Sequence, residues 1–361
     1  MVAVLVTGGA GYIGSHACVE LLLSGRDVVV LDNFSNSSPV ALKRIKDLTG
    51  KSFRVYNVDL LDKAGLEHVF SENDIEAVLH FAGLKAVGES VSVPLKYYRN
   101  NVIGTVYLCE VMQQYGVKRM VFSSSATVYG VAENVPITED SRLTAINPYG
   151  RTKLMIEELL HDIYQADDEW RIAVLRYFNP VGAHSSGKIG EDPKGTPNNL
   201  MPYIAQVAAG KRPQLSVFGA NYPTKDGTGI RDYIHVVDLA LAHLKALEYI
   251  QAHAGIEAFN IGTGVGYSVL EMINAFEQAS GKTIPYIVSE RRNGDVALCY
   301  ANPDKARSRL KWQAKRDIHA MCEDTWRWQS NNPNGYQSVS DSRQAPIEKE
   351  SPLVKTAAFL L

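Results

Sequence analysis

A glycine-rich turn near the start of the chain joins a short apolar run to a helix-like apolar stretch. Residues 2–6 are all apolar, as in a strand buried inside a parallel sheet. The turn places Gly8, Gly11 and Gly14 before a helical pattern that continues to Leu23. Such glycines allow a tight turn, close approach of the backbone to a pyrophosphate, and close packing of helix on strand. The segment therefore predicts the start of a βαβ unit, with a dinucleotide phosphate at the helix N-terminus.

The second apolar run of this unit ends in an acid. Residues 27–32 form the run, and Asp32 follows the glycine turn at about the ~20-residue distance expected of an acid that binds the adenosine ribose. A carboxylate at this position repels a 2′-phosphate, and the neighbouring Asn33 adds no positive charge. The sequence therefore predicts NAD, rather than NADP, as the cofactor.

Apolar runs alternate with helical patterns through the first half of the chain. This alternation predicts an α/β fold: a doubly wound, Rossmann-type parallel sheet with helices on both faces. Residues 91–115 are long enough to form one extended helix across a face. The expected strands are 2–7, 27–32, 53–58, 76–82, 119–124 and 171–177.

After residue 178 the alternation gives way to stretches rich in glycine, proline and asparagine, although 200–210 again has a helical pattern. Loop-rich regions often carry substrate contacts. We therefore expect an NAD-binding domain over 1–178 and a smaller α/β substrate-binding lobe over 179–337, from which the chain crosses back to the first domain. Residues 338–361 are expected to form a poorly ordered extension.

The composition narrows the classes of function. A formal net charge of −2 provides no field that would attract nucleic acid or an anionic membrane. The first strand starts at residue 2, which leaves no room for a signal peptide, and no apolar run approaches the ~20 residues of a membrane span. The four cysteines are far apart and the histidines are scattered. We therefore expect a cytoplasmic protein with reduced thiols and no metal site.

Tyr149 and Lys153 form the most informative pair for chemistry. Asn147 can cap a helix and Pro148 suits its first turn, so Tyr149 and Lys153 fall at i and i+4 on one helix face. A phenol has an unperturbed pKa near ~10, too high for a good base at neutral pH. A lysine ammonium held against it would favour the phenolate and lower that pKa.

Three serines follow the expected strand 119–124. Ser123, Ser124 and Ser125 lie at its C-terminal end, which in such a sheet faces the ligand crevice. One of them can complete a Ser–Tyr–Lys group with Tyr149 and Lys153. His80 also follows an apolar run, where a hydrogen-bonded core histidine is the expected role.

Together these features resemble the extended short-chain dehydrogenase/reductase superfamily, and within it the UDP-hexose 4-epimerases. The resemblance covers residues 2–336 and depends on several long motifs in the same order. Besides the glycine turn and the Tyr149–Lys153 pair, these motifs stand at 80–90, 123–130, 176–184, 197–203, 226–235 and 291–295.

The resemblance implies particular site residues. Ser125, Tyr149 and Lys153 are the implied catalytic group, with Ser124 kept as the alternative serine. The residues implied to line the NAD are Gly8, Gly11, Tyr12, Ile13, Gly14, Asp32, Asn33, Asp59, Leu60, Phe81, Ala82, Gly83, Lys85, Asn100, Ser125, Tyr149, Lys153 and Phe178. Those implied to hold the UDP-sugar are Asn179, Asn199, Leu200, Phe218, Arg231, Arg292, Asp295 and Cys299.

The implied reaction is the reversible epimerisation of UDP-galactose and UDP-glucose at C4, through a transient 4-keto sugar and tightly bound NAD. Tyr149 would take the proton of the 4-hydroxyl, while Ser125 would hydrogen-bond the 4-oxygen. The resemblance also implies a homodimer joined by helices of the larger lobe, with 91–115 as a candidate. Cys299 stands where the family often has a bulky tyrosine, which implies room for a 2-N-acetyl group. Tyr300 could instead provide that bulk.

Three other functions are compatible with parts of this pattern. A nucleotide-sugar 4,6-dehydratase pattern has Asp-Glu where this chain has Ala126 and Thr127, so the groups needed for water loss are missing. A UDP-glucuronate 4-epimerase or decarboxylase would act only on uronic acid substrates. A non-catalytic NAD-sensing protein would not need the Ser–Tyr–Lys group.

Overall fold

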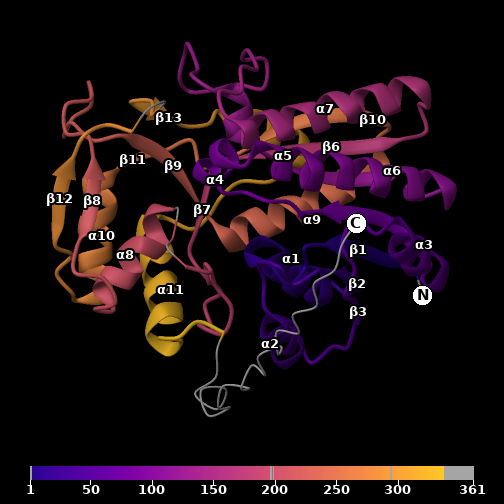
Figure 1. Cartoon of the computed structure of the whole chain (residues 1–361), viewed down its shortest axis with the longest axis horizontal. Coiled ribbons are helices and arrows are strands. Elements are labelled where there is room, and N and C mark those ends of the chain that lie inside the picture. The colour runs from indigo at the N-terminus through magenta and orange to yellow at the C-terminus, as the bar shows by residue number, and fades with distance from the viewer. Residues whose placement is uncertain (1, 196, 198, 293–294, 337–361) are drawn as a thin grey trace, which may run out of the picture.

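A parallel sheet forms the centre of the larger lobe (Figure 1). The computed structural model describes residues 2–195, 197, 199–292 and 295–336; the expected 338–361 extension lies outside them. The sheet has seven strands in the order β10-β6-β5-β4-β1-β2-β3, all parallel. From β1 the chain adds β2 and β3 on one side of the sheet, and then β4, β5 and β6 on the other side. This reversal of strand order between β1 and β4 places a ligand crevice at their C-terminal ends. The strands are β1 (Ala3–Thr7), β2 (Asp27–Leu31), β3 (Arg54–Tyr56), β4 (Ile75–His80), β5 (Arg119–Ser125), β6 (Arg171–Tyr177) and β10 (Gly255–Ile261).

Helices cover both faces of this sheet, as the sequence predicts. One apolar cluster packs α1 (Tyr12–Leu23), α2 (Pro39–Thr49) and α9 (Val236–Ala252) against one face. A second cluster packs α3 (Lys63–Glu72), α6 (Gly104–Gln114) and α7 (Pro148–Ala166) against the other. His80 is a core residue, because its ring nitrogens are hydrogen-bonded to the hydroxyls of Thr7 (2.8 Å) and Thr105 (2.9 Å).

The prediction of one helix over 91–115 is wrong at its start. The chain forms α4 (Val87–Ser92), breaks at Val93, and resumes with α5 (Pro94–Tyr97). A π-helical segment (Tyr98–Ile103) then leads directly into α6. The break occurs because the residue before a proline is sterically disfavoured in the helical region. Val93 accordingly has φ −133° and ψ 60°.

The smaller lobe is built around β9 (Ile230–His235). This strand pairs with β7 (Asn179–Val181), β11 (Gly266–Ser268) and β13 (Leu298–Cys299). Three helices and a further strand pair, β8 (Leu215–Phe218) with β12 (Tyr286–Ser289), surround a third apolar cluster. The helices are α8 (Leu200–Ala208), α10 (Val269–Ser280) and α11 (Ile318–Asn331), and two short helical segments lie at Ala126–Tyr129 and Ala306–Leu310. Between these elements the chain returns to the large sheet through α9 and β10.

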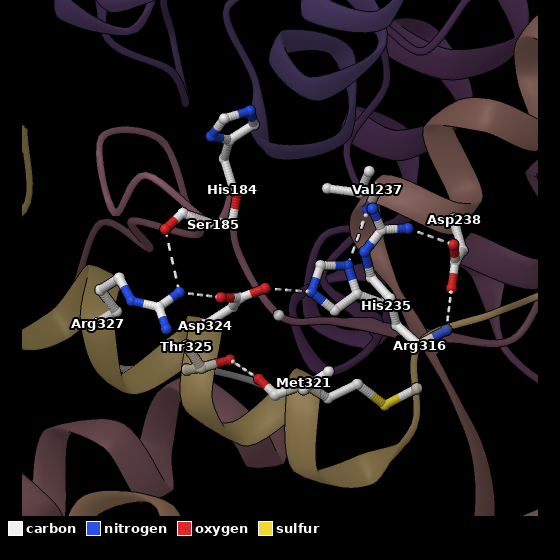
Figure 2. A network of polar contacts seen from close by, with 12 residues as sticks. His184, Ser185, His235, Val237, Asp238, Arg316, Met321, Asp324, Thr325 and Arg327 are labelled. Atoms are coloured by element: carbon white, nitrogen blue, oxygen red, sulfur yellow. Dashed lines mark hydrogen bonds and ion pairs between the residues drawn. The ribbon is translucent and has the colours of Figure 1, made fainter.

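A polar network fixes α11 to the junction of β9 and α9 (Figure 2). The His235 ring accepts from the backbone N–H of Val237 (3.1 Å) and contacts Asp324 on α11 (3.2 Å). Asp324 pairs with Arg327, whose guanidinium donates to the carbonyl of Ser185 (3.0 Å). The network thus joins α11, β9 and the segment after β7.

None of the described helices combines the length and apolar composition that crossing a bilayer requires.

Candidate active site

The glycine turn after β1 forms a close-packed cradle at the start of α1. Gly8 has φ +70°, and a Cβ on Gly14 would lie 2.2 Å from the carbonyl oxygen of Gly8. No side chain caps the helix at Gly11, and its first turn contains no acid. The backbone N–H groups and the positive end of the helix dipole are therefore free to bind phosphate. The cradle fits the pyrophosphate of NAD.

Asp32 lies at the C-terminal end of β2, beside this cradle. Its buried carboxylate accepts from the N–H groups of Ala10 (2.9 Å) and Phe34 (2.9 Å) and from the hydroxyl of Ser37 (2.7 Å). Phe34 has φ +55°, a conformation that non-glycine residues rarely adopt. Asn33 donates to Asp59 (2.7 Å). These contacts fix a carboxylate where the adenosine ribose of NAD would bind.

Lys153 lies on the α7 face that looks onto the end of β5. Asn147 caps α7 through the N–H of Gly150 (2.8 Å), as predicted, and Pro148 occupies its first turn. The Lys153 Nζ donates to the carbonyl of Ser123 (2.7 Å) and is 5% exposed. Burial lowers the pKa of Lys153 to about 8, although the nearby Glu157 carboxylate opposes the shift. A Cβ on Gly83 would approach this Nζ to 3.9 Å, so Gly83 leaves space beside it.

Tyr149 is buried one helical turn before Lys153. Its side chain is 6% exposed, and burial raises its pKa to about 12, with a hydrogen bond from Ser125 acting in the lowering direction. The sequence predicts a lowered pKa, and this prediction is wrong for the protein without ligands. The reason is that loss of solvation outweighs the local polar contacts, while Lys153 directs its ammonium to Ser123.

The two candidate serines face different partners. The Ser124 hydroxyl donates to Glu157, which forms a buried ion pair with Arg176 (2.6 Å). The Ser125 oxygen accepts from the N–H (3.2 Å) and the hydroxyl (3.0 Å) of Thr127. Its remaining hydroxyl proton is thereby left for Tyr149 or a ligand. Sequence reasoning missed Thr127 as a partner, although a hydroxyl two residues after a strand-ending serine is the pattern of a local side-chain turn.

Four of the residues expected to hold UDP form a connected group in the smaller lobe: Phe218, Arg231, Arg292 and Asp295. Arg231 on β9 contacts Asp295 (3.3 Å), which also accepts from Arg292 (2.9 Å). The guanidinium of Arg292 lies 4.9 Å from the ring centre of Phe218. Phe218 is 39% exposed and the Arg292 side chain 56% exposed. The Arg292 guanidinium and the Phe218 ring are therefore accessible together, whereas the Arg231 side chain is only 19% exposed. Guanidinium groups of this kind suit a nucleoside diphosphate.

Cys299 lies beside Arg231 on neighbouring strands and packs against the cluster that contains Phe178. Tyr300 follows the end of β13, and a Cβ on Gly266 would meet the Tyr300 ring at 3.5 Å. The Tyr300 ring therefore lies against β11.

The remaining predicted residues are of two kinds: apolar residues that pack on the large sheet, and polar residues that form contacts near the boundary between the lobes. Ile13, Leu60, Phe81 and Ala82 pack on the two clusters of the large sheet. Tyr12 donates to the carbonyl of Gly182 (2.6 Å), and Lys85 pairs with Glu191 (2.9 Å). Asn100 donates to Asn101 (2.9 Å), while Asn179 and Leu200 begin β7 and α8. Glu191 had no signal in the sequence, since its two partners lie far from it along the chain.

Comparisons with known proteins identify the family of this chain. The family model described as GDP-mannose 4,6 dehydratase matches residues 5–325. The UDP-glucose 4-epimerase of Bacillus subtilis (strain 168) is 66% identical over 337 residues, which are 93% of this chain and 99% of that relative.

Solved structures give the same result. UDP-glucose 4-epimerase from Bifidobacterium longum, in complex with NAD⁺ and UDP, matches with a TM-score of 0.90 and 52% identity over 93% of this chain and 100% of that one. The UDP-Glc/GlcNAc 4-epimerase from Campylobacter jejuni matches with a TM-score of 0.81 and 39% identity, covering 92% of this chain and 100% of that one. Within the described ranges, no group of three or more His, Cys, Asp or Glu side chains is placed to hold a metal ion.

Proposed function

Because the chain belongs to the family of the GDP-mannose 4,6 dehydratase model and, within it, to the UDP-glucose 4-epimerases, we propose that Ser125, Tyr149 and Lys153 catalyse its reaction. The reaction is NAD-dependent interconversion of UDP-galactose and UDP-glucose. The observation that carries the assignment of residues is their convergence at the C-terminal end of β5. This strand pairs with β4, and the strand order reverses between β4 and β1, where such sheets bind ligands at the C-terminal strand ends.

The proton step belongs to Tyr149. Its phenol oxygen takes the proton of the sugar 4-hydroxyl as C4 is oxidised, and returns it when the 4-keto sugar is reduced. When bound, NAD⁺ supplies the hydride acceptor and a positive charge near the phenol. Lys153 adds its ammonium charge, and Ser125 donates to the 4-oxygen or to the phenolate. Together these groups oppose the burial that raises the tyrosine pKa.

Epimerisation requires the 4-keto sugar to turn over while its carrier stays bound. Arg231 and Arg292 suit this need because they can hold the diphosphate through charge-assisted hydrogen bonds. The hexose region beside Cys299 offers a small side chain instead of a polar clamp. Strong contacts to UDP and weak contacts to the sugar permit the rotation.

The small Cys299 side chain also extends the proposed substrate range to UDP-N-acetylglucosamine and UDP-N-acetylgalactosamine. A tyrosine ring at this position would fill space that a thiol leaves open. The Tyr300 ring lies against Gly266 of β11, which supports Cys299, rather than Tyr300, as the residue that borders this space. The likeness to the Campylobacter jejuni UDP-Glc/GlcNAc 4-epimerase supports the same range.

The proposal includes a homodimer and a cytoplasmic location. Support for the dimer comes from exposed apolar side chains on α4 and on the helix that follows it: Val91, Leu95 (82% exposed) and Ile103. Leu95 belongs to α5 and Ile103 to the π-helical segment that follows it, so both lie in the stretch expected to join two copies. Burying such a face against a second copy would remove apolar surface from water.

The test is to incubate the purified protein, without added NAD, with UDP-galactose and separately with UDP-N-acetylgalactosamine. NMR would follow the appearance of each 4-epimer. Conversion of both is the expected result. Conversion of UDP-galactose alone would contradict the open pocket at Cys299. Conversion of neither, even with NAD supplied, would contradict the epimerase assignment and favour a uronic acid substrate or a binding role.

A further inference from the structure

The segment after β7 runs along the boundary between the two lobes. We name residues 184–195 the interlobe strap. On the side of the NAD-binding lobe, Arg44 of α2 donates to the strap carbonyl of Lys188 (2.7 Å). Lys194 of the strap donates to the carbonyls of Phe34 (3.2 Å) and Ser35 (3.0 Å), directly after the ribose-binding Asp32. The strap is therefore attached to the loop expected to surround the adenosine.

The other side of the strap is held by the C-terminal helix and the residues after it. Arg327 donates to the carbonyl of Ser185, as Figure 2 shows. The indole of Trp328 donates to the backbone carbonyl of Glu191 (3.0 Å). Gly190 packs so tightly on that indole that a Cβ would lie 2.4 Å from the ring. The backbone at Glu191 is thus fixed from the smaller lobe.

The carboxylate of Glu191 joins residues expected at two different ligands. A single oxygen, Oε1, accepts from Lys85 Nζ (2.9 Å) and from Asn199 Nδ2 (3.2 Å). Lys85 belongs to the set proposed for NAD, and Asn199 to the set proposed for UDP. The side chain of Glu191 is only 11% exposed, whereas that of Lys85 is 48% exposed. A nearly buried anion therefore connects one donor from each nucleotide site.

We propose that Glu191 is a positioning residue that couples occupancy of the NAD site to occupancy of the UDP site. The inference rests on the proposed function, because it takes Lys85 and Asn199 as nucleotide-binding groups. A ligand that orders one donor also orders the shared carboxylate, so the second donor loses less conformational freedom when its own ligand binds. By thermodynamic linkage the effect is reciprocal: UDP tightens NAD and NAD tightens UDP.

The coupling can be measured without turnover. Bound NAD is exchanged for isotope-labelled NAD in the presence and absence of saturating UDP, and UDP affinity is measured by calorimetry. UDP without a hexose is the right probe, because no sugar then contacts the nicotinamide. In the wild type, saturating UDP is expected to slow NAD exchange by about tenfold, within the usual range of coupling between sites.

Two variants of Glu191 should change the ratio of NAD exchange rates without and with UDP by different amounts. Glu191→Ala should bring the ratio of NAD exchange rates without and with UDP close to one. Glu191→Gln, which keeps an acceptor oxygen but not the charge, should give an intermediate ratio. Both should fold, because a pair with a half-exposed lysine contributes little to stability. Glu248→Gln, which removes a surface pair with Lys245, is the matched control and should leave the ratio unchanged.

The outcomes separate the inference from the proposed function. One outcome would overturn the coupling alone: the wild type binds UDP and epimerises UDP-galactose, but its NAD exchange rate is the same with and without UDP. A Glu191→Ala variant with the wild-type ratio would do the same. A wild type that binds no UDP would overturn the coupling together with the assignment of the UDP site. A ratio lost in Glu191→Ala and kept in Glu248→Gln supports the coupling.

Discussion

The two halves of the site are built in different ways. In the NAD-binding lobe, Asp32, Ser125, Tyr149 and Lys153 are all buried at strand ends or on one helix face. In the smaller lobe, the side chains of Phe218 and Arg292 are substantially exposed, and Arg292 comes from a loop. The residues proposed for the chemistry are therefore held in place by the sheet, whereas two of those proposed to bind UDP, Phe218 and Arg292, are exposed.

This difference has an energetic meaning. Burial perturbs the pKa values of the catalytic group, raising that of Tyr149 to about 12 and lowering that of Lys153 to about 8. In the smaller lobe, Arg231 and Arg292 instead pair with Asp295. Substitutions in the first lobe should consequently affect kcat, and those in the second should affect KM.

The largest expected effect is that of Tyr149→Phe. Removing the phenol oxygen removes the group that takes and returns the proton, so kcat should fall by about 10²–10⁴-fold. The variant should still bind NAD, because the glycine cradle and Asp32 are unchanged. Turnover of UDP-galactose and the NAD content of the purified protein are the two measurements. Near-normal turnover would refute the role of Tyr149.

A comparison of Ser125→Ala with Ser124→Ala tests which serine acts in catalysis. Ser125→Ala should lower kcat by about 10²-fold, the usual cost of removing one donor to a developing oxyanion. Ser124→Ala removes a hydrogen bond to the buried Glu157 and should instead destabilise the fold by about 1–3 kcal/mol. Steady-state kinetics and denaturant unfolding of both variants are needed. The opposite pattern would assign Ser124 as the catalytic residue.

Arg231→Gln tests whether a substitution in the smaller lobe affects KM more than kcat. Loss of a charge-assisted contact to the diphosphate should raise KM by about 10–100-fold, with a much smaller change in kcat. Initial rates over a range of UDP-galactose concentrations give both constants. A large fall in kcat at unchanged KM would break the proposed division between the lobes.

The extent of sequence prediction follows the same division. The glycine turn, Asp32 and the Asn147-capped helix carrying Tyr149 and Lys153 could be predicted, because local patterns determine them. The raised pKa of Tyr149 could not be predicted from the sequence, since its burial depends on the packed fold. The helix break at Val93 could have been read from Pro94. Glu191 could not, because its contacts with Lys85 and Asn199 exist only after the lobes assemble.

Cys299→Tyr should alter substrate range more than overall rate. The added ring should lower kcat/KM for UDP-N-acetylgalactosamine by about tenfold or more, because it fills the space proposed for the acetyl group. Activity on UDP-galactose should change little. Parallel kinetics on the two substrates provide the test, with Cys299→Ser as a control of similar size to the thiol. Equal losses on both substrates would show that Cys299 does not select between them.

A different kind of effect is expected on the pH dependence of stability. Burial lowers the pKa of Lys153 from its ordinary value of 10.5 to about 8, so the folded state binds this proton more weakly than the unfolded state does. The resulting penalty is complete below pH 8 and disappears as pH rises toward 10.5; it amounts to at most about 3 kcal/mol. Lys153→Met should lose this rise in stability. Urea unfolding of the NAD-free proteins between pH 7.5 and 10 would show it, and identical slopes would contradict it.

The central claim is that the hydrogen at C4 leaves the sugar as a hydride and returns to the same carbon. The most direct measurement uses UDP-galactose deuterated at C4, with no added NAD, and NMR of the UDP-glucose formed in ordinary water. Because a transferred hydride does not exchange with solvent, the product should retain deuterium at C4. Product that carries solvent hydrogen at C4 would contradict the account, since the proton held by Tyr149 would then be the one delivered to carbon.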